Sequence, residues 1–240
     1  MRVAIMSDVH RFDLALEAVL ADLVHRGPFE QVVVAGDLCH GGPGPARALE
    51  LLLDSGATLL LGNTDFELVE AAATGVVDED QRFALDQLGA SGISHLAGLP
   101  FSHRVTPPQG MSPDDDLLVV HANPHDLSQK IRPEMSDGEI VGVLGQVPAS
   151  AIAFGHHHVS FIRHVAGKLL VDVSAVGNPR DGDLRARYGI LTWHRSGQSW
   201  SAEIVRVGYP LEETLAEMRA SRMPRPERAI ARLLKASYES

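Results

Sequence analysis

Cysteine, long apolar runs and basic charge are all scarce in this sequence. Cys39 is the single cysteine among 240 residues, which excludes an intrachain disulfide and fits a reducing compartment. No apolar run approaches the ~18 residues that a membrane helix needs, and the stretch 1–8 turns acidic too early for a signal peptide. We therefore expect a cytoplasmic protein without a membrane partner.

The charge balance narrows the range of partners. The 21 Lys and Arg residues are outnumbered by 31 Asp and Glu residues, which gives a net charge of -10 at pH 7. This argues against a broad electrostatic grip on nucleic acid, and so against a processive nuclease. A small phosphorylated substrate, a nucleotide or a short oligonucleotide stays open, because bound divalent cations could reverse the sign of the charge locally.

The first half of the sequence alternates short apolar runs with helical patterns. Runs at 3–6, 32–35 and 58–61 are typical of buried strands, while 12–23 and 45–53 carry helical spacing between them. A longer helical stretch at 65–95 follows. Strands that alternate with helices predict an α/β fold with right-handed crossovers.

The second half is richer in strands. We expect a hairpin over 101–120, a short helix within 126–146, a strand at 151–154, and hairpins over 160–173 and 188–207. This pattern predicts two sheets packed face to face with helices outside. We expect a single domain over 1–240, in which 211–240 forms a C-terminal extension of two amphipathic helices packed on it. That extension could cover a cleft, mediate a homo-oligomer or only pack on the sheet.

The most distinctive stretch is a histidine triplet, His156-His157-His158, which follows the apolar run 151–154 and Gly155. Residues two apart in an extended segment face the same side, so His156 and His158 can converge while His157 faces away. A convergent histidine pair at a strand end is typical of a metal site.

The other predicted strands also end in residues that could bind metal. Any one of them could be a turn former or a helix cap, but sites in α/β folds form beyond the carboxyl ends of strands, and three successive strands end this way. The candidate ligands are Asp8, His10, Asp37, Asn63, His121, His156 and His158.

This mixed set of carboxylate, imidazole and amide oxygen favours Mn²⁺, with iron, Zn²⁺ or Ni²⁺ as alternatives, over Ca²⁺. Seven ligands are too many for one tetrahedral ion but fit two divalent ions that share a carboxylate. Two ions ~3.5–4 Å apart are a standard arrangement for the hydrolysis of phosphoesters.

The order of these motifs resembles the ligand blocks of the calcineurin-like metallophosphoesterases. The matching motifs are Asp8-x-His10, Gly36-Asp37, Gly62-Asn63, His121 and Gly155-His156-x-His158. The stretch 173–188 is similar to a later block of a bacterial branch described as predicted phosphoesterases or as diadenosine-tetraphosphatase-like. The resemblance implies a four-layer sandwich of two mixed β-sheets flanked by α-helices.

The resemblance also implies roles for the ligands. One metal ion would take Asp8, His10, Asp37 and His158, and the other would take Asp37, Asn63, His121 and His156, with Asp37 as the bridge. Asp37 and Asn63 are accordingly expected to take part in catalysis, and Asn63 to contact the substrate as well.

Position 64 departs from the family pattern. Many members have a histidine there, which contacts phosphate and helps the leaving group depart, whereas this chain has Thr64. A threonine hydroxyl can donate a hydrogen bond to the substrate but cannot act as a general acid near neutral pH. Either turnover favours good leaving groups or another histidine substitutes. His40 is the first candidate, with His125 and His157 behind it, and an exposed loop histidine is the alternative interpretation of His40.

Arg180 is a candidate phosphate clamp, because a guanidinium pairs bidentately with phosphate. The alternative is an ion pair with Asp181 or Asp183. Cys39 is expected to be a small buried filler rather than a ligand.

These interpretations predict a two-metal phosphoesterase in which a metal-bridging hydroxide attacks phosphorus. Phosphodiesters with good leaving groups are the favoured substrates because of Thr64. A nucleotide polyphosphate hydrolase and a phosphomonoesterase are the alternatives, and a non-catalytic scaffold is the third.

Overall fold

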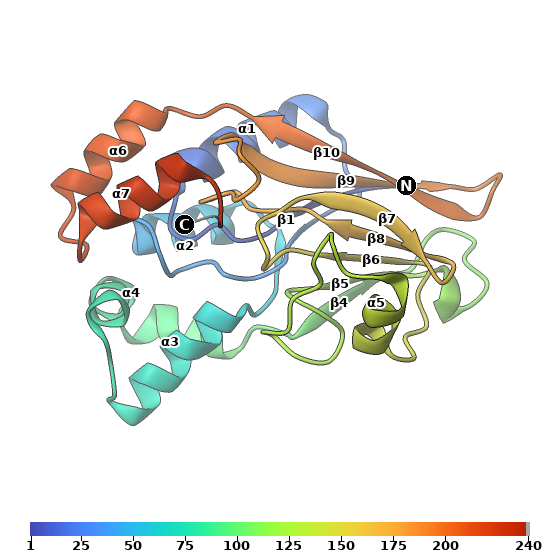
Figure 1. Cartoon of the computed structure of the whole chain (residues 1–240), viewed down its shortest axis with the longest axis horizontal. Helices are drawn as coiled ribbons and strands as arrows, with labels where there is room; N and C mark the ends of the chain where they lie inside the picture. The colour runs from blue at the N-terminus through green and yellow to red at the C-terminus, as the bar shows by residue number, and fades with distance from the viewer. Residues whose placement is uncertain (239–240) are drawn as a thin grey trace.

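Two mixed five-stranded sheets form the centre of the computed structural model, which describes residues 1–238 (Figure 1). The first sheet has the order β10-β9-β1-β2-β3, in which β1, β2 and β3 are parallel and β9 and β10 run antiparallel to their neighbours. Its strands are β1 (Arg2–Met6), β2 (Gln31–Val34), β3 (Thr58–Leu59), β9 (Ala186–His194) and β10 (Ser199–Val207).

The second sheet has the order β4-β5-β6-β8-β7. Its three inner strands are parallel, while the edge strands β4 and β7 pair antiparallel with β5 and β8. Its strands are β4 (Ser102–Val105), β5 (Leu117–Val120), β6 (Ala151–Phe154), β7 (Phe161–Val165) and β8 (Lys168–Asp172). The hairpin at Ala166-Gly167 is confirmed, and a short 3₁₀ turn (Pro113–Asp115) precedes β5.

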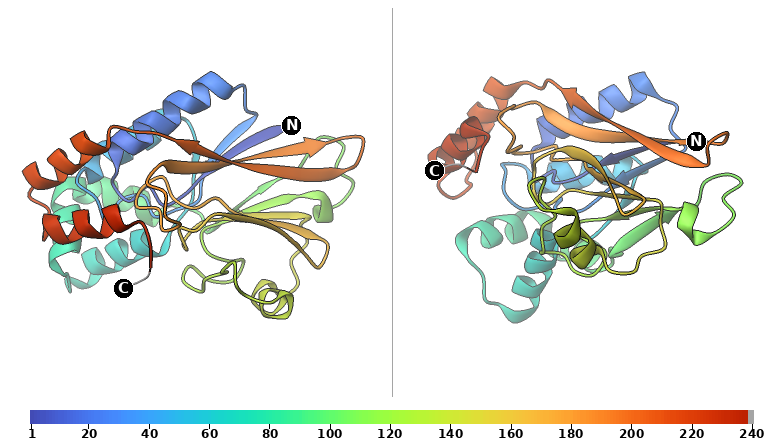
Figure 2. Two further views of the ribbon diagram at one scale, coloured as in Figure 1. Left: turned by 45° about the horizontal axis from the view of Figure 1, so that its top comes forward. Right: turned by 45° about the vertical axis from the view of Figure 1, so that its right-hand side comes forward.

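The two sheets pack face to face, and the alternation of side chains along each strand divides the core into layers. On β1, Val3 and Ile5 point into the core between the sheets, whereas Ala4 and Met6 point to the helices on the outer face. On β6, Ile152 and Phe154 face α5 on the other outer side. Figure 2 shows α1 beyond the first sheet and α5 beyond the second. The predicted four-layer α/β sandwich is thus confirmed.

Helices cover the outer faces unequally. Among the helices of residues 1–238, only α5 (Asp137–Leu144) lies on the second sheet, where Ile140, Val143 and Leu144 are buried against it. The other helices share one apolar cluster with the first sheet. They are α1 (Asp13–Arg26), α2 (Pro45–Asp54), α3 (Asn63–Thr74), α4 (Glu79–Ala97), α6 (Leu211–Ala220) and α7 (Pro226–Lys235).

The C-terminal extension contains the two predicted helices, α6 and α7, on either side of Pro224 and with Pro226 as the first residue of α7. Leu215, Met218, Ile230 and Leu233 from these helices are buried in the helix-side core. Residues 239–240 of the predicted extension lie outside the described part of the chain. No helix within residues 1–238 is long and apolar enough to cross a membrane.

A buried carboxyl group ends β8. The Asp172 side chain is fully buried, its Oδ1 accepts a hydrogen bond from the Ser174 backbone N–H at 2.7 Å, and its Oδ2 has no partner among the described residues. Burial raises the pKa of Asp172 well above its ordinary value, and the negative charges of Asp8 and Asp181 raise it further.

Asp172→Asn should therefore stabilise the metal-free protein at pH 7.5 by about 1–3 kcal/mol. The unfolded aspartate ionises near pH ~4 while the folded one stays protonated to higher pH, so Asp172 lowers the stability of the wild type as pH rises above ~4, and the variant lacks this contribution. Chemical unfolding in chelator at pH 4.0 and 7.5 measures both proteins. Equal stability differences at the two pH values would contradict the raised pKa.

Candidate metal centre

Six of the candidate ligands stand in the loops that follow β1, β2, β5 and β6, and Asn63 is the first residue of α3, shortly after β3. Five of them have left-handed backbone conformations, which are rare for residues other than glycine and cost about 1 kcal/mol or more each. Their φ values are 54° for Asp8, 51° for His10, 56° for Asp37, 64° for His156 and 60° for His158. Such strain gathers where the surrounding structure holds side chains in place for a function.

One group of ligands joins the loop after β1 to the histidine triplet. His158 Nε2 lies 3.0 Å from Asp8 Oδ1 and 3.1 Å from His10 Nε2. The three side chains are buried and offer donor atoms within 4.8 Å of one another. This is the set, apart from Asp37, that the family resemblance implies for one metal ion.

The second group joins the loops after β2, β5 and β6 to the start of α3. His121 Nε2 lies 3.0 Å from Asn63 Oδ1 and 3.2 Å from His156 Nδ1. Asp37, His121 and His156 offer donor atoms within 4.8 Å of one another. The amide oxygen of Asn63 faces the same nitrogen of His121, as expected of the fourth member.

Asp37 lies between the two groups. Its Oδ2 is 3.6 Å from His10 Nε2, and its Oδ1 is 3.4 Å from His121 Nε2. Each oxygen of one carboxylate therefore faces a different group, which is the geometry that a bridging ligand requires. His156 and His158 belong to different groups, so the triplet spans both.

Each of the four candidate histidine ligands is oriented by a backbone carbonyl. The carbonyls of His40, Ala35 and Asn178 accept from Nδ1 of His10, His121 and His158 at 2.6, 2.7 and 2.8 Å, and the carbonyl of Ser128 accepts from Nε2 of His156 at 2.8 Å. These bonds direct the lone pair of the other ring nitrogen into the centre. Sequence reasoning could not identify these acceptors, because every residue carries a carbonyl.

Two glycines leave room for the ligands. A Cβ at Gly155 would overlap Asp8 Oδ2 and Ser7 Oγ, and a Cβ at Gly62 would overlap the Asp37 backbone nitrogen and Oδ1. The glycines before Asn63 and His156 are thus required by the close approach of the loops after β2 and β1.

Asp65 has a structural role that sequence reasoning missed. Its buried carboxylate accepts hydrogen bonds from the backbone N–H groups of Leu38, Cys39 and Gly62, and so ties the loop after β2 to the start of α3. Burial and then the charge of Asp37 raise the pKa of Asp65 to about 6. Its position two residues after Asn63, at the start of a helix, was the available signal.

The pKa shifts in the centre show that its carboxylates favour a nearby positive charge. Burial would raise the pKa of Asp8, but His158 and His10 lower it well below its usual value. Burial would lower the pKa of His10 and His121, yet the carboxylates of Asp8 and Asp37 raise both. Protons on these groups compete with metal ions, so metal affinity is expected to fall as pH falls.

The other predicted site residues lie near the centre without joining either group. The Thr64 backbone N–H donates to Asp37 Oδ1 at 2.9 Å, and its buried Oγ1 has no partner among the described residues. His40 is mostly buried rather than a water-exposed loop residue, and its Nε2 is likewise unpartnered within 1–238. Burial, and then the charge of Arg11, lower the pKa of His40 to about 4, so it is neutral at pH 7.

Arg180 is buried and donates from Nη1 to the Arg232 carbonyl at 2.7 Å. Among the described residues, Asp181 and Asp183 pair with Arg185, Arg187 and Arg206, so the alternative ion pair of Arg180 is absent.

The two other candidate histidines and the cysteine belong to neither ligand group. His125 Nε2 contacts the Leu144 carbonyl at 2.8 Å, and the His157 ring stacks on Tyr238 at a centroid distance of 5.1 Å. Cys39 is fully buried, as expected of a filler.

Comparison with known proteins identifies the family. Residues 1–196 match the Calcineurin-like phosphoesterase superfamily domain, so the chain belongs to this superfamily. An uncharacterised protein of Methanocaldococcus jannaschii is 24% identical over 257 aligned positions, which cover 92% of this chain and 93% of that protein.

Two solved structures share the fold over nearly the whole chain. A metallophosphoesterase from Sphaerobacter thermophilus is 25% identical with a TM-score of 0.77, over 98% of this chain and 100% of that one. A hypothetical protein from Pyrococcus horikoshii reaches a TM-score of 0.80 at 14% identity, over 99% of each chain, and shows the fold alone. The family and the two ligand groups together support hydrolysis of phosphoesters.

The side chains in the centre fit two divalent cations. With Nδ1 of both rings donating to carbonyls, the Nε2 lone pairs of His10 and His158 face one another at 3.1 Å. Two lone pairs at that distance repel unless a cation or a proton lies between them. His121 Nε2 and His156 Nδ1 repeat the arrangement at 3.2 Å. Imidazole and carboxylate donors suit Mn²⁺, iron, Zn²⁺ or Ni²⁺.

Gly155→Ala should abolish metal binding at the Asp8 group, because the new Cβ displaces the carboxylate. Adding Mn²⁺ to chelator-treated wild type should raise the unfolding free energy by about 2.7 kcal/mol at one hundred times the dissociation constant, and Gly155→Ala should lose most of that gain. Calorimetric titration and thermal unfolding measure both. Gly138→Ala is the matched control, since its Cβ meets no atom within 4 Å. Full metal affinity in Gly155→Ala would contradict this geometry.

Proposed function

We propose that this chain is a metal-dependent phosphodiesterase that prefers substrates with good leaving groups and works best with Mn²⁺. The observation that carries the proposal is the pair of ligand groups on either side of Asp37, combined with Thr64 where many members of the family have a histidine. When bound, two divalent ions supply Lewis acidity that lowers the pKa of water and offsets charge on phosphoryl oxygens.

The protein's own groups position the substrate and provide little acid catalysis. The amide of Asn63 and the hydroxyl of Thr64 stand at the N-terminus of α3, where hydrogen-bond donors and the helix dipole favour a phosphate oxygen. Thr64 cannot protonate a departing oxygen at neutral pH, and the neutral His40 imidazole is a weak acid. The leaving group must therefore depart largely as an anion, which favours aryl over alkyl esters.

The alternatives make different demands. A nucleotide polyphosphate hydrolase needs binding groups for further phosphates, and a phosphomonoesterase needs positive charge for a dianionic phosphate. A non-catalytic scaffold needs no intact ligand set, yet all seven ligand positions here carry metal-binding side chains with converging donor atoms. The scaffold is therefore the least favoured.

Hydrolysis of bis(p-nitrophenyl) phosphate with added Mn²⁺ tests the activity. Asp37→Asn should lower kcat by more than ~100-fold, beyond what the loss of an outer-sphere partner usually costs, because one oxygen of the bridge becomes an amide. Chelated wild type should be equally slow. Asp54→Asn, an exposed carboxyl on α2, should match the wild type. Equal, negligible rates in all four samples would refute the proposal that the protein is an enzyme.

The absence of a general acid predicts a steep dependence on the leaving group. Across phosphodiesters that differ only in the leaving group, kcat/KM of the wild type should fall strongly from nitrophenyl to alkyl esters. Thr64→His should restore about 10²-fold on the alkyl esters, the lower end for an added general acid, and change the nitrophenyl esters little. His40→Ala tests whether His40 replaces the missing general acid. If the variant hydrolyses the alkyl esters as fast as the wild type, His40 is excluded as the substitute acid.

A further inference from the structure

The chain returns to the metal centre at its C-terminal end. After α7, the Gly182 backbone N–H donates to the Ala236 carbonyl at 2.8 Å, and the Tyr238 hydroxyl donates to the His157 carbonyl at 2.7 Å. The Tyr238 ring stacks on the His157 ring with an interplanar angle of 7°. Tyr238 therefore holds the residue that lies between two metal ligands.

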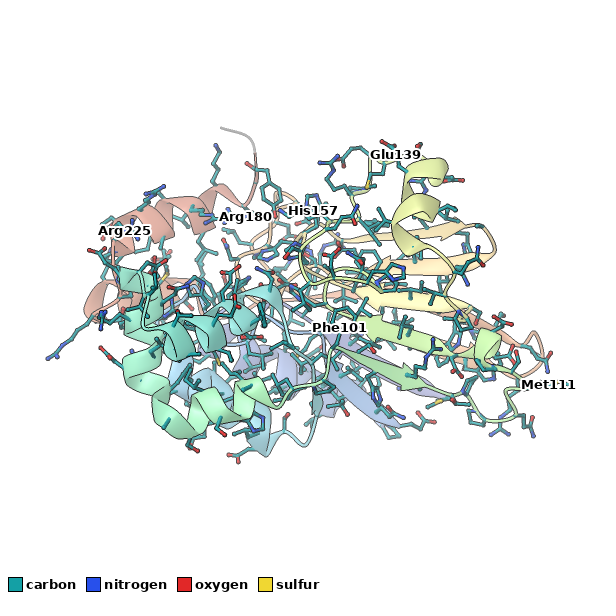
Figure 3. The ribbon with its side chains drawn as sticks, turned by 90° about the horizontal axis from the view of Figure 1, so that it is seen from below. Phe101, Met111, Glu139, His157, Arg180 and Arg225 are labelled. Atoms are coloured by element: carbon teal, nitrogen blue, oxygen red, sulfur yellow. The ribbon has the colours of Figure 1, made fainter. Side chains whose placement is uncertain are left out.

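Two cations lie near the ring of this tyrosine, and the charge of a third, Arg232, acts on the nearby Arg180. Lys130 Nζ lies 5.1 Å and the Arg180 guanidinium carbon 5.9 Å from the centre of its ring, and Arg180 also contacts the Arg232 backbone. In Figure 3, Arg180 and His157 lie next to one another under the C-terminal segment. We call Lys130, Arg180 and Arg232 the basic rim.

The basic rim is adjacent to the metal ligands. The Arg180 backbone N–H donates to the His158 carbonyl at 2.9 Å, and Lys130 follows by two residues the Ser128 carbonyl that orients His156. An anion held by the rim would thus lie beside a phosphoryl group at the metal centre.

In the described part of the chain, the positive charges of the rim have no balancing carboxylate. Within residues 1–238, none of the three cations forms an ion pair, although the chain has a net charge of -10. Arg180 is only 5% exposed, and its buried Nη2 has no hydrogen-bond partner there. Burial and the neighbouring charge of Arg232 lower the pKa of Arg180 to about 10. Two cations over one ring repel each other, and a buried unpaired charge is costly, so an anion would relieve both.

We propose that the basic rim is a second anion site, which binds a phosphoryl group of the substrate other than the one that is hydrolysed. The physiological substrate is then a small molecule with two phosphoryl groups, such as a nucleotide bisphosphate derivative. This inference rests on the proposed phosphodiesterase activity for its account of the first phosphoryl group.

Binding tests the anion site without turnover. Calorimetry with Mn²⁺-loaded protein compares thymidine 3′,5′-bisphosphate with thymidine 5′-monophosphate, which differ by one phosphate. The wild type should prefer the bisphosphate, and Lys130→Ala combined with Arg232→Ala should reduce that preference about tenfold. Arg180 contacts only the backbone carbonyl of Arg232, so its hydrogen bond survives the change. Arg195→Ala, on the exposed β9–β10 turn, removes one positive charge outside the basic rim and should have no effect.

Kinetics extend the test to substrates. The 5′-(p-nitrophenyl) phosphodiester of thymidine and the same ester with a 3′-phosphate share the reacting bond. The double variant should raise KM only for the second ester and leave kcat of both unchanged. A rise of equal size for both, or no change in either assay, would overturn the proposal. If the wild type hydrolysed neither ester but still preferred the bisphosphate, the proposed phosphodiesterase activity would be wrong and the proposed anion site would be supported.

A carboxylate of the chain itself could act on the basic rim, so a control variant removes its charge. Glu239 follows Tyr238 in the sequence and lies outside the described residues. The preference for the bisphosphate should persist in Glu239→Gln. Its disappearance in that variant would show that the basic rim does not form the site, and would also overturn the proposal.

Discussion

The repulsion between facing imidazole nitrogens is the interaction on which the centre depends. His10 faces His158 and His121 faces His156 at hydrogen-bond distance, with the remaining nitrogen of each ring committed to a carbonyl. A fold that aims four lone pairs inward must hold the rings against that repulsion, and backbone carbonyls that accept from the other ring nitrogens contribute to this. The left-handed ligand positions are part of the same cost, since they turn each side chain abruptly from the strand end into the centre.

The hydrogen bonds that hold the candidate ligands also connect the two sheets. The Ala35 carbonyl, just past β2 in the first sheet, accepts from His121, just past β5 in the second. Asp8 Oδ2, after β1, accepts the backbone N–H of His156, after β6, at 2.7 Å. Bonds that orient the ligands are therefore the bonds that hold the open ends of the sheets together. Apolar side chains between the sheets fix their distance, while these polar contacts fix how one sheet is aligned with the other.

Patterns that repeat along the sequence were predictable, and contacts between distant loops were not. The apolar runs and hairpin turns predicted nearly every strand, and the order of the motifs led to the four-layer fold. Strand bounds differed in detail, since β3 ends at Leu59 rather than at residue 61. His156 and His158 take part in different groups because of contacts between loops that are distant in the sequence. Both contact Asp8, which precedes them by 148 and 150 residues. The carbonyl acceptors, the anchoring by Asp65 and the cations around Tyr238 depend on where loops meet, which local periodicity does not encode.

The long separation between ligands has a topological consequence. Asp8 and His158 would hold the same ion across 150 residues of chain, so a bound metal closes most of the polypeptide into a loop, as a crosslink does. Closing so long a loop is unfavourable in an unfolded chain, and the ligands are scattered along it. The ion would therefore have little affinity for the unfolded chain and would bind only after the strands have assembled. Resistance to proteolysis would then report how fully the centre is loaded.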